Sequence, residues 1–319
     1  MSDLGRVVVL AGGLTYERDV SLRSGRRVVD ALKSAGAEAI LADTDPALLP
    51  LLAELAPAAS FIALHGGSGE DGAIRGVLDC AGVPYVGAGA NACRLAFDKP
   101  VAKELIRRAG LATPDWVAVP HTTFRELGAS AVLDRIIERL GLPLMVKPAQ
   151  GGSALGASAV FEAAQLPGAM VGCFSYGEIA LVEQFVVGTE IAVSVLELDA
   201  GDPQALPAVE IAATGGAYDY GARYTAGETD FHVPARVSDE ITAAAAELAL
   251  AAHRVLGLRD LSRTDAIVDA TGTVQFLEVN VAPGMTETSL LPMAAAAAQL
   301  QLGIVCRDLL AAAAARGPG

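Results

Sequence analysis

Short apolar runs alternate with an amphipathic segment in the first hundred residues, and this alternation constrains the fold more than any other feature. The runs RVVVLAGG at 6–13, EAILADTD at 38–45 and SFIALHGG at 60–67 are typical of strands. Between the first two runs, residues 19–36 have the periodicity of a helix that stops at a glycine. Strands that alternate with helices predict a parallel sheet with helices on its faces. We therefore expect an α/β fold here.

Two of these predicted strands end in Gly-Gly, at 12–13 and at 66–67. In parallel sheets of this kind, ligands bind beyond the carboxyl ends of the strands. Both glycine pairs should therefore border one crevice, and so should the acids that follow them, Glu17 in the first loop and Glu70 and Asp71 in the second. The dinucleotide-binding pattern G-x-G-x-x-G does not follow the first strand, which argues against an NAD-binding domain.

After residue 98 the pattern changes to mixed helices and strands. A short helix is expected at 99–110, then a strand that carries Lys147, then a loop of glycine, serine and alanine. Two β-rich runs meet at Gly188, a helix is expected at 238–257, and alanine-rich runs near the end favour helices. We therefore expect three domains: residues 1–98 with the parallel sheet, 99–188 as a central α+β domain, and 189–319 as a C-terminal α+β domain.

Composition restricts the class of protein. Of the 319 residues 52% are apolar and 19% are charged, and the net charge is −14. No basic stripe offers a surface for nucleic acid, and no apolar run reaches the roughly 18 residues of a membrane helix. The four cysteines have no C-x-x-C spacing, which predicts buried thiols in a reducing compartment. These features favour a cytoplasmic enzyme that acts on small molecules.

The most informative stretch is DAIVDATGTVQFLEVN, residues 265–280. Two β-rich runs flank a turn signal, which predicts a hairpin. A two-residue turn at 271–272 would set Asp265 opposite Glu278 and Arg263 opposite Asn280, all on one face. Opposed carboxylates repel each other, and a divalent cation would remove that repulsion, because Mg²⁺ prefers oxygen ligands. The alternative is a solvated polar face without a metal.

A magnesium site of this kind also requires phosphate-binding groups, because Mg²⁺ is usually shared with substrate phosphates. Lys147 at a strand end and the glycine-rich loop at 151–156 are the candidates. The sequence contains no P-loop. Alone, the loop is more typical of a flexible hairpin than of a phosphate site. Combined with Lys147 and the acidic hairpin, it favours ATP as the ligand.

These motifs together resemble the D-alanine–D-alanine ligase family of the ATP-grasp superfamily. The resemblance runs nearly end to end and keeps the family's order: AGGLTYERDVSLRSG, HGGSGEDG, GVPYVGAG, VKPAQGGSALG, VEQFVVGTE, YDYGARY, RTDAIV and FLEVNVAPGMTETSLLPM. It implies an ATP-grasp fold with the ATP site between the central and C-terminal domains. It also implies that ATP converts one D-alanine to an acyl phosphate, which the amine of a second D-alanine attacks, in peptidoglycan precursor synthesis.

The resemblance implies roles for individual residues. The catalytic residues would be Glu17, Ser153, Tyr224, Arg263 and Gly284. ATP would contact Lys99, Lys147, Glu183, Gln184, Val186, Glu190 and Arg223. Two Mg²⁺ or Mn²⁺ ions would bind Asp265, Glu278 and Asn280. The amino-acid substrates would contact His65, Glu70, Ser289 and Leu290. The resemblance further implies a homodimer.

Several positions depart from the family's pattern. Arg223 stands where lysine is usual, and Gln184 stands where a lysine commonly follows the glutamate of the adenine-binding segment. Ala154 replaces a serine of the glycine-rich loop. Leu14, Thr15 and Tyr16 precede Glu17, where serines are common. The last change leaves a second hypothesis, an ATP-grasp ligase that joins other D- or L-amino acids. A third is a binding protein without catalysis, which the intact acidic hairpin argues against.

Overall fold

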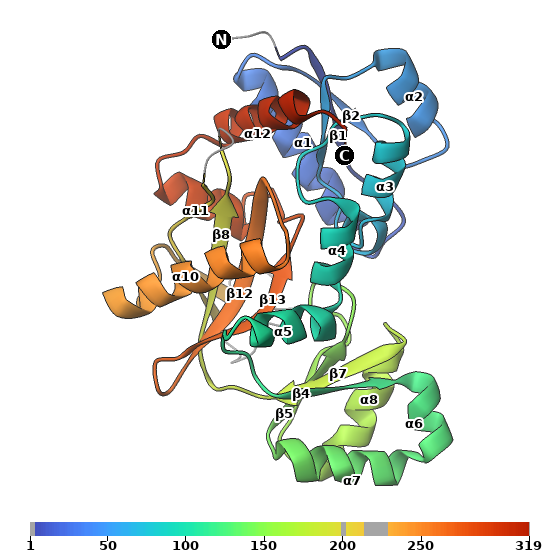
Figure 1. Ribbon diagram of the computed structural model, residues 1–319, viewed down its shortest axis with the longest axis vertical. Helices are drawn as coiled ribbons and strands as arrows, with labels where there is room; N and C mark the ends of the chain where they lie inside the picture. Colours follow the sequence, from blue (N-terminus) through green and yellow to red (C-terminus); the bar gives the residue numbers. More distant parts are fainter. Residues whose placement is uncertain (1–3, 199–201, 214–228, 319) are drawn as a thin grey trace.

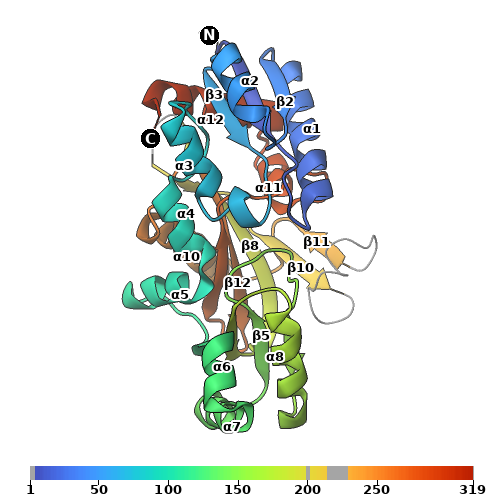
Figure 2. The ribbon, with the colours of Figure 1, turned by 90° about the vertical axis from the view of Figure 1, so that its right-hand side faces the viewer.

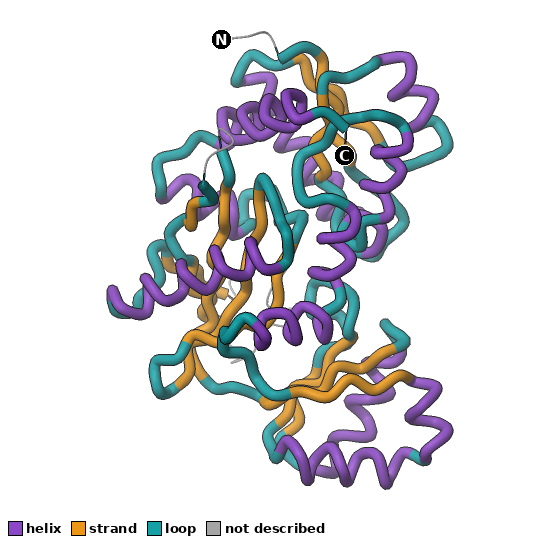
Figure 3. Tube along the Cα trace, in the orientation of Figure 1, coloured by secondary structure: helices purple, strands orange, loops and turns teal. Residues whose placement is uncertain are grey.

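The structure is a computed structural model that describes residues 4–198, 202–213 and 229–318 (Figure 1). It contains three sheets along an elongated molecule, with helices packed against each of them (Figures 2 and 3). The first and last described segments lie at the same end of the molecule. The expected α/β character is confirmed.

The first sheet is parallel, with strand order β2-β1-β3. Its strands are β1 (Arg6–Leu10), β2 (Glu38–Ala42) and β3 (Ala59–Ile62), and α1 (Arg18–Ser34) connects the first two. Val7 and Val9 face the layer formed by α1, whereas Val8 and Leu10 face the opposite layer. This alternation follows from the period of two along a strand. The predicted βαβ unit is therefore confirmed.

Short helices of about two turns complete the N-terminal part, and sequence periodicity did not single them out. They are α2 (Leu48–Leu55), α3 (Ala73–Cys80) and α4 (Ala90–Phe97). Gly72, at φ +90, directly precedes α3, and Gly89 directly precedes α4. The stretch from 65 to 99 is thus two helices separated by turns. The expected helix at 99–110 is α5 (Lys99–Arg108).

The central part is a four-stranded antiparallel sheet of order β4-β7-β5-β6 with its own apolar core. Its strands and helices are β4 (Trp116–Pro120), α6 (His121–Leu127), α7 (Ala129–Leu140), β5 (Leu144–Pro148), β6 (Ser158–Val160), α8 (Leu166–Phe174) and β7 (Ile179–Gln184). Its helices occupy the end of the molecule opposite the first sheet (Figure 1).

The third sheet has the order β11-β10-β8-β12-β13, with β9 paired to β8. Its strands are β8 (Gly188–Leu196), β9 (Gln204–Ala205), β10 (Val209–Ala213), β11 (Thr229–His232), β12 (Leu261–Asp269) and β13 (Val274–Asn280). Helix α10 (Asp239–Val255) covers it, and α5 packs against the same core. Ala88, Cys93 and Ala96 belong to this core too, so chain segments from all three expected domains share it.

The last two helices, α11 (Leu290–Ala297) and α12 (Leu302–Arg316), return to the first sheet. Val305, Leu309 and Leu310 of α12 are buried in one core with Val28 and Leu32 of α1. Figure 1 shows α12 beside α1. Residues more than 270 positions apart in the sequence thus form one layer. Boundaries at 98 and 188 remain a prediction.

Among the described residues, no single helix is both long and apolar enough to cross a membrane. The pair α11 and α12 reaches that length and composition only together, with a bend of 105° between them. Cys93, Cys173 and Cys306 are buried, as expected, whereas Cys80 is exposed, and all four are free thiols.

Candidate active site

A large cavity lies between the central and third sheets. Its volume is about 760 Å³, within the range of roughly 300–1,000 Å³ that is usual for ligand sites. Strands β5 and β7 line one side, and β8, β12 and β13 line the other. The walls include Lys99, Lys147, Glu183, Gln184, Val186 and Glu190, all of which were expected to contact a nucleotide.

Glu183 is the electrostatic centre of this cavity. Its carboxylate is 2.5 Å from the Lys147 ammonium and 2.7 Å from the Lys103 ammonium. Burial opposes the charge on Glu183, but the two lysines outweigh it and hold the pKa of this carboxyl below its usual value. Burial lowers the pKa of Lys103 to about 8. The carboxylate of Glu183 is thus committed to holding two cations in place.

The main chain that follows Glu183 leaves one N–H group to the cavity. The N–H of Gln184 donates to the Asp115 carbonyl, and that of Phe185 donates to the Pro143 carbonyl. Within the described part of the chain, no group accepts a hydrogen bond from the Val186 N–H. Val186 lines the cavity. Its N–H is therefore a donor that a ligand can use.

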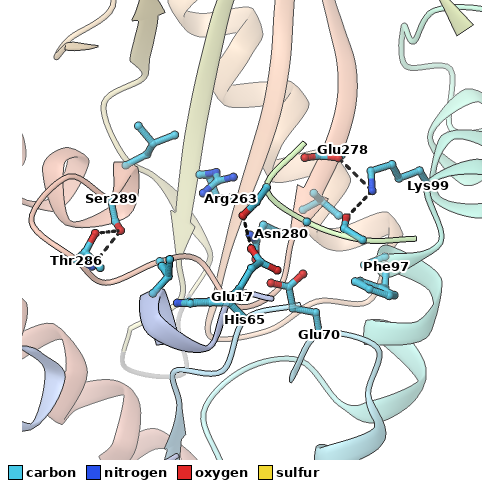
Figure 4. Close-up of a pocket in the computed structure, with 18 of the residues that line it drawn as sticks. Glu17, His65, Glu70, Phe97, Lys99, Arg263, Glu278, Asn280, Thr286 and Ser289 are labelled. Atoms are coloured by element: carbon cyan, nitrogen blue, oxygen red, sulfur yellow. Dashed lines mark hydrogen bonds and ion pairs between the residues drawn. The ribbon is translucent and has the colours of Figure 1, made fainter. Parts of the chain in front are cut away.

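A second, smaller cavity adjoins the first (Figure 4). Its volume is about 110 Å³, and its lining is largely polar. Lys99, Gly151, Gly152 and Glu278 belong to the walls of both cavities. Residues near each of the three sheets line the smaller cavity. They include Glu17, His65, Glu70, Ser153, Arg263, Asn280, Gly284, Ser289 and Leu290.

Glycines bring the loops of this cavity close to Glu17. The Ser153 hydroxyl donates to the Glu17 carboxylate across the cleft. A Cβ on Gly66 would lie 2.3 Å from Glu17 Oε2, and one on Gly152 would lie 2.9 Å from it. A side chain at either position would displace the Glu17 carboxylate. The glycine-rich loop is also tied to Lys99, whose ammonium donates to the Gly151 carbonyl at 2.7 Å.

Glu17 and Glu70 place two carboxyl groups in the small cavity. Burial, reinforced by the charge of Glu17, raises the pKa of Glu70 to about 7. Glu70 Oε1 accepts a hydrogen bond from the Gly66 N–H at 3.1 Å. A cationic group placed between the two carboxyls would stabilise both as anions. The cavity is therefore suited to an ammonium group.

His65 is buried and bonded on both sides within the protein. Nδ1 donates to the Ala282 carbonyl at 3.1 Å, and Nε2 lies 2.9 Å from the Ser24 hydroxyl. Burial lowers the pKa of His65 to about 4, so the ring is neutral near pH 7. Nδ1 carries the proton, because a carbonyl can only accept. His65 thus forms a wall of the pocket, and its nitrogens are directed at protein groups.

The β12–β13 hairpin pairs Arg263 with Asn280 and Asp265 with Glu278, as predicted. The predicted two-residue turn is wrong. The N–H of Asp269 donates to the Thr273 carbonyl, which leaves a three-residue loop at 270–272, and Gly272 has φ +84. A bulge beside Asp265 adds one residue to β13 and restores the expected pairing beyond it.

The candidate metal ligands face cations of the protein. Asp265 accepts two hydrogen bonds from Arg263, at 2.7 and 2.8 Å, and Glu278 lies 3.5 Å from the Lys99 ammonium. Across the described residues, no three His, Cys, Asp or Glu side chains gather as a metal site. The set is instead two carboxylates and the amide of Asn280, and these oxygen donors suit Mg²⁺ or Mn²⁺ by type.

The far end of the small cavity is formed by the start of α11. Ser289 precedes the helix, and its hydroxyl contacts both the N–H and the hydroxyl of Thr286, at 3.0 and 2.8 Å. Figure 4 shows Thr286 and Ser289 opposite Lys99, with Arg263 between them. Leu290 begins α11, whose N-terminal N–H groups favour anions. This end can therefore receive a carboxylate.

Tyr224 and Arg223, expected on a loop over the site, lie outside the described residues. Lys103, Ser24 and Arg27 were not among the expected residues. Lys103 could have been found from its spacing, because it lies one helical turn after Lys99.

A nucleotide-sized cavity between two antiparallel sheets, joined to a small polar pocket, is the arrangement of an ATP-grasp ligase. A family profile described as D-ala D-ala ligase C-terminus matches residues 105–311. The chain belongs to the D-alanine–D-alanine ligase family.

Individual relatives agree over nearly full length. The D-alanine–D-alanine ligase of Pelotomaculum thermopropionicum is 41% identical over 93% of this chain and 92% of its own, and that of Nitrosospira multiformis is 42% identical over the same shares. The crystal structure of the Bacillus anthracis ligase matches at TM-score 0.80 with 28% identity over 98% of both chains. The complex of that ligase with ATP matches equally well, at 26% identity. The VanG D-Ala:D-Ser ligase of Enterococcus faecalis matches at TM-score 0.80 with 25% identity, over 96% of this chain and 98% of its own.

Proposed function

We propose that this chain joins two D-alanine molecules to D-alanyl-D-alanine at the expense of ATP, for cell-wall precursor synthesis. The observation that carries the proposal is the wall shared by the two cavities. Lys99, Gly151, Gly152 and Glu278 line both. A phosphate at the end of the large cavity would therefore meet a carboxylate held in the small one.

The first amino acid binds with its ammonium between Glu17 and Glu70 and with its carboxylate directed at Arg263. Lys99 and Lys147 hold the phosphates of ATP, and the ligand's adenine reaches the Val186 N–H. Phosphoryl transfer to the carboxylate gives an acyl phosphate. Arg263 and the Gly284 N–H stabilise the negative charge that grows on the carbonyl oxygen when the second amine attacks. Ser289 and Leu290 receive the second carboxylate.

Asp265, Glu278 and Asn280 are proposed to hold Mg²⁺ or Mn²⁺, two ions in all. A divalent cation there supplies positive charge that neutralises the transferring phosphoryl group. Asp265 would supply carboxylate oxygen to the cation, and its hydrogen bonds with Arg263 would place the guanidinium beside the metal site. We further propose that the protein is a cytoplasmic homodimer.

The size of the small cavity bears on the alternative substrates. At about 110 Å³ it favours small amino acids over bulky ones. Tyr16, which suggested a larger first substrate, is 83% exposed and is absent from the cavity's lining. Its ring contacts Tyr176 at a centroid distance of 6.3 Å instead. D-serine in the second position remains the alternative to test, because it differs from D-alanine by one hydroxyl.

The test is ADP release with a panel of D- and L-amino acids, with Mg²⁺ present or omitted, and with the product identified by mass spectrometry. We expect D-alanyl-D-alanine as the dominant product and no turnover without a divalent cation. Release of ADP with D-serine or a bulky amino acid but not with D-alanine would contradict the proposal. Absence of ADP with every amine would indicate a binding protein.

A further inference from the structure

The loop that connects β13 to α11, residues 281–289, is held by side chains from the N-terminal part of the chain. His65 Nδ1 donates to the Ala282 carbonyl at 3.1 Å. The Met285 N–H donates to the Ser24 hydroxyl at 3.1 Å. Ser24 is fully buried and also contacts His65. These bonds join segments that are more than 200 residues apart in the sequence.

Arg27 adds a charged donor to these contacts. Its Nη1 donates to the Met285 carbonyl at 2.9 Å and to the Thr286 carbonyl. Its Nε lies 3.9 Å from the Glu287 carboxylate, which is 79% exposed and therefore contributes little. A guanidinium nitrogen that donates to two consecutive carbonyls fixes the directions of both, because its N–H bonds lie in the rigid plane of the guanidinium.

Gly284 lies between these anchors. Ala282 is held before it, and Met285 and Thr286 are held after it. Gly284 lines the small cavity, and no described group accepts a hydrogen bond from its N–H. A Cβ at Gly284 would lie 2.6 Å from the Ser289 hydroxyl, so the loop is also closely packed from within. The direction of the Gly284 N–H is thus set by its neighbours.

We propose that Arg27 is a positioning residue for the ligation step: with Ser24 and His65 it clamps residues 282–286 so that the Gly284 N–H points at the reacting carbonyl. The inference rests on the proposed function. Arg27 does not line either cavity, and it acts only through the loop.

The position of Arg27 on α1 gives the clamp a further consequence. Glu17, Val20, Ser24 and Arg27 recur at the spacing of one helical face. The first two line the small cavity and the last two hold the loop. One rigid helix therefore carries both the group proposed for the first ammonium and the support of the proposed oxyanion donor. Displacement of the helix would misalign both.

The test compares Arg27→Met with Arg27→Lys and with the control Arg26→Met. Methionine keeps an unbranched side chain but cannot donate to either carbonyl, whereas lysine can still reach one of them. Arg26 is the exposed neighbour on the same helix. For each protein we would measure kcat, the KM values for ATP and D-alanine, and the melting temperature.

We expect Arg27→Met to lower kcat by about 10- to 100-fold, because small misplacements of a catalytic group have effects of this size. The KM for ATP should stay within about twofold, since the ATP cavity does not contact the clamp. Arg27→Lys should recover part of the kcat, and Arg26→Met should match the wild type. The melting temperature of each variant shows whether its kcat falls only because the protein is less stable.

The proposal is overturned if Arg27→Met and Arg26→Met have equal kcat, or if the loss appears only in the KM for ATP. A kcat that falls only in proportion to the fraction of unfolded protein would also overturn it. The wild type distinguishes failure of this proposal from failure of the proposed function. If the proposed function is wrong, the wild type itself releases no ADP with D-alanine.

Discussion

Glu278 faces an anion and a cation at once. Asp265 is its partner across the hairpin, and the Lys99 ammonium lies 3.5 Å from its carboxylate. Removing the charge of Glu278 relieves a repulsion and weakens an attraction, so the net effect on folding should be small. Its effect on a bound cation should be large, because an amide is a weaker ligand for Mg²⁺ than a carboxylate.

We therefore expect Glu278→Gln to unfold at the same urea concentration as the wild type, within experimental error, but to require far more Mg²⁺ for half-maximal turnover. The measurement is turnover as a function of Mg²⁺ concentration, together with direct Mn²⁺ binding to the ATP-bound protein. Glu126→Gln, which removes an exposed carboxylate away from the hairpin, is the control. Wild-type turnover of Glu278→Gln at millimolar Mg²⁺ would exclude the hairpin as the metal site.

Glu70 predicts a pH dependence of stability. Its pKa in the folded protein is about 7, above the ordinary value of 4.5, because burial and Glu17 favour the neutral form. The contribution of neutral Glu70 to the free energy of unfolding is therefore complete below the pKa of the unfolded chain and is lost as the pH rises through 7. This contribution amounts to at most about 3 kcal/mol. Urea unfolding of the ligand-free protein should show decreasing stability between about pH 5 and pH 8.

In Glu70→Gln this decrease should be largely absent, whereas exposed Glu126→Gln should keep it. D-alanine should reduce it in the wild type, because an ammonium between Glu17 and Glu70 stabilises the ionised form. A decrease of equal size in all three proteins would assign it to other groups.

At the residue scale, the sequence predicted which side chains line the site better than it predicted their partners. Glu17, Arg263 and Ser289 are recognisable from local motifs and do line the small cavity. The pairing of Lys103 with Glu183, or of Arg27 with Met285, joins positions 80 and 258 residues apart. No periodicity or local spacing encodes such a contact, because the tertiary fold creates it.

At the scale of elements, helix α5 shows how a single cap can position the site. Asp98 accepts a hydrogen bond from the Val101 N–H at 3.2 Å and another from the Gln150 amide at 3.1 Å. Lys99, the first residue of the helix, projects into both cavities. The cap therefore fixes the end of the helix that carries Lys99, which is proposed to bind ATP. It also joins this helix end to the glycine-rich loop.

Asp98→Ala should cost about 0.5–2 kcal/mol of unfolding free energy, the usual cost of losing an N-cap. Asp98→Asn should lose much less, because asparagine can accept the same hydrogen bond. Urea unfolding of both variants measures the difference. Equal stability of the alanine and asparagine variants would mean that the cap does not contribute.

Elements were predicted best where a long pattern specified them. The first sheet and the long helix α1 follow from alternation and periodicity. Helices α3 and α4 have eight residues each and follow glycines, so no periodic pattern develops. The predicted hairpin had the correct residue pairs although its turn was wrong, because the bulge beside Asp265 compensates for the three-residue loop. Sequence alone does not reveal a bulge of this kind.

At the scale of the whole molecule, the C-terminal helix completes the N-terminal layer. Leu310 of α12 is fully buried in the core that α1 and the first sheet share. The central sheet has a separate core, formed within residues 119–182. Sequence order would place α12 with the third sheet. Its docking on α1 depends on apolar complementarity between surfaces that are distant in sequence, and a linear pattern does not contain that information.

This arrangement predicts a local effect of a C-terminal change. Leu310→Ala should destabilise the protein by about 2–5 kcal/mol, the usual cost of this truncation in a core. Leu127→Ala is the matched control, because Leu127 is 67% exposed, and its effect should stay within about 0.5 kcal/mol. Hydrogen exchange should show faster exchange in β1, β3 and α1, while the strands of the central sheet keep their protection, because local stability follows local packing. Because α1 also carries Glu17 and Arg27, turnover of Leu310→Ala should fall at temperatures where the central sheet is still protected. Equal loss of protection in all three sheets would instead mean that the chain unfolds as one cooperative unit.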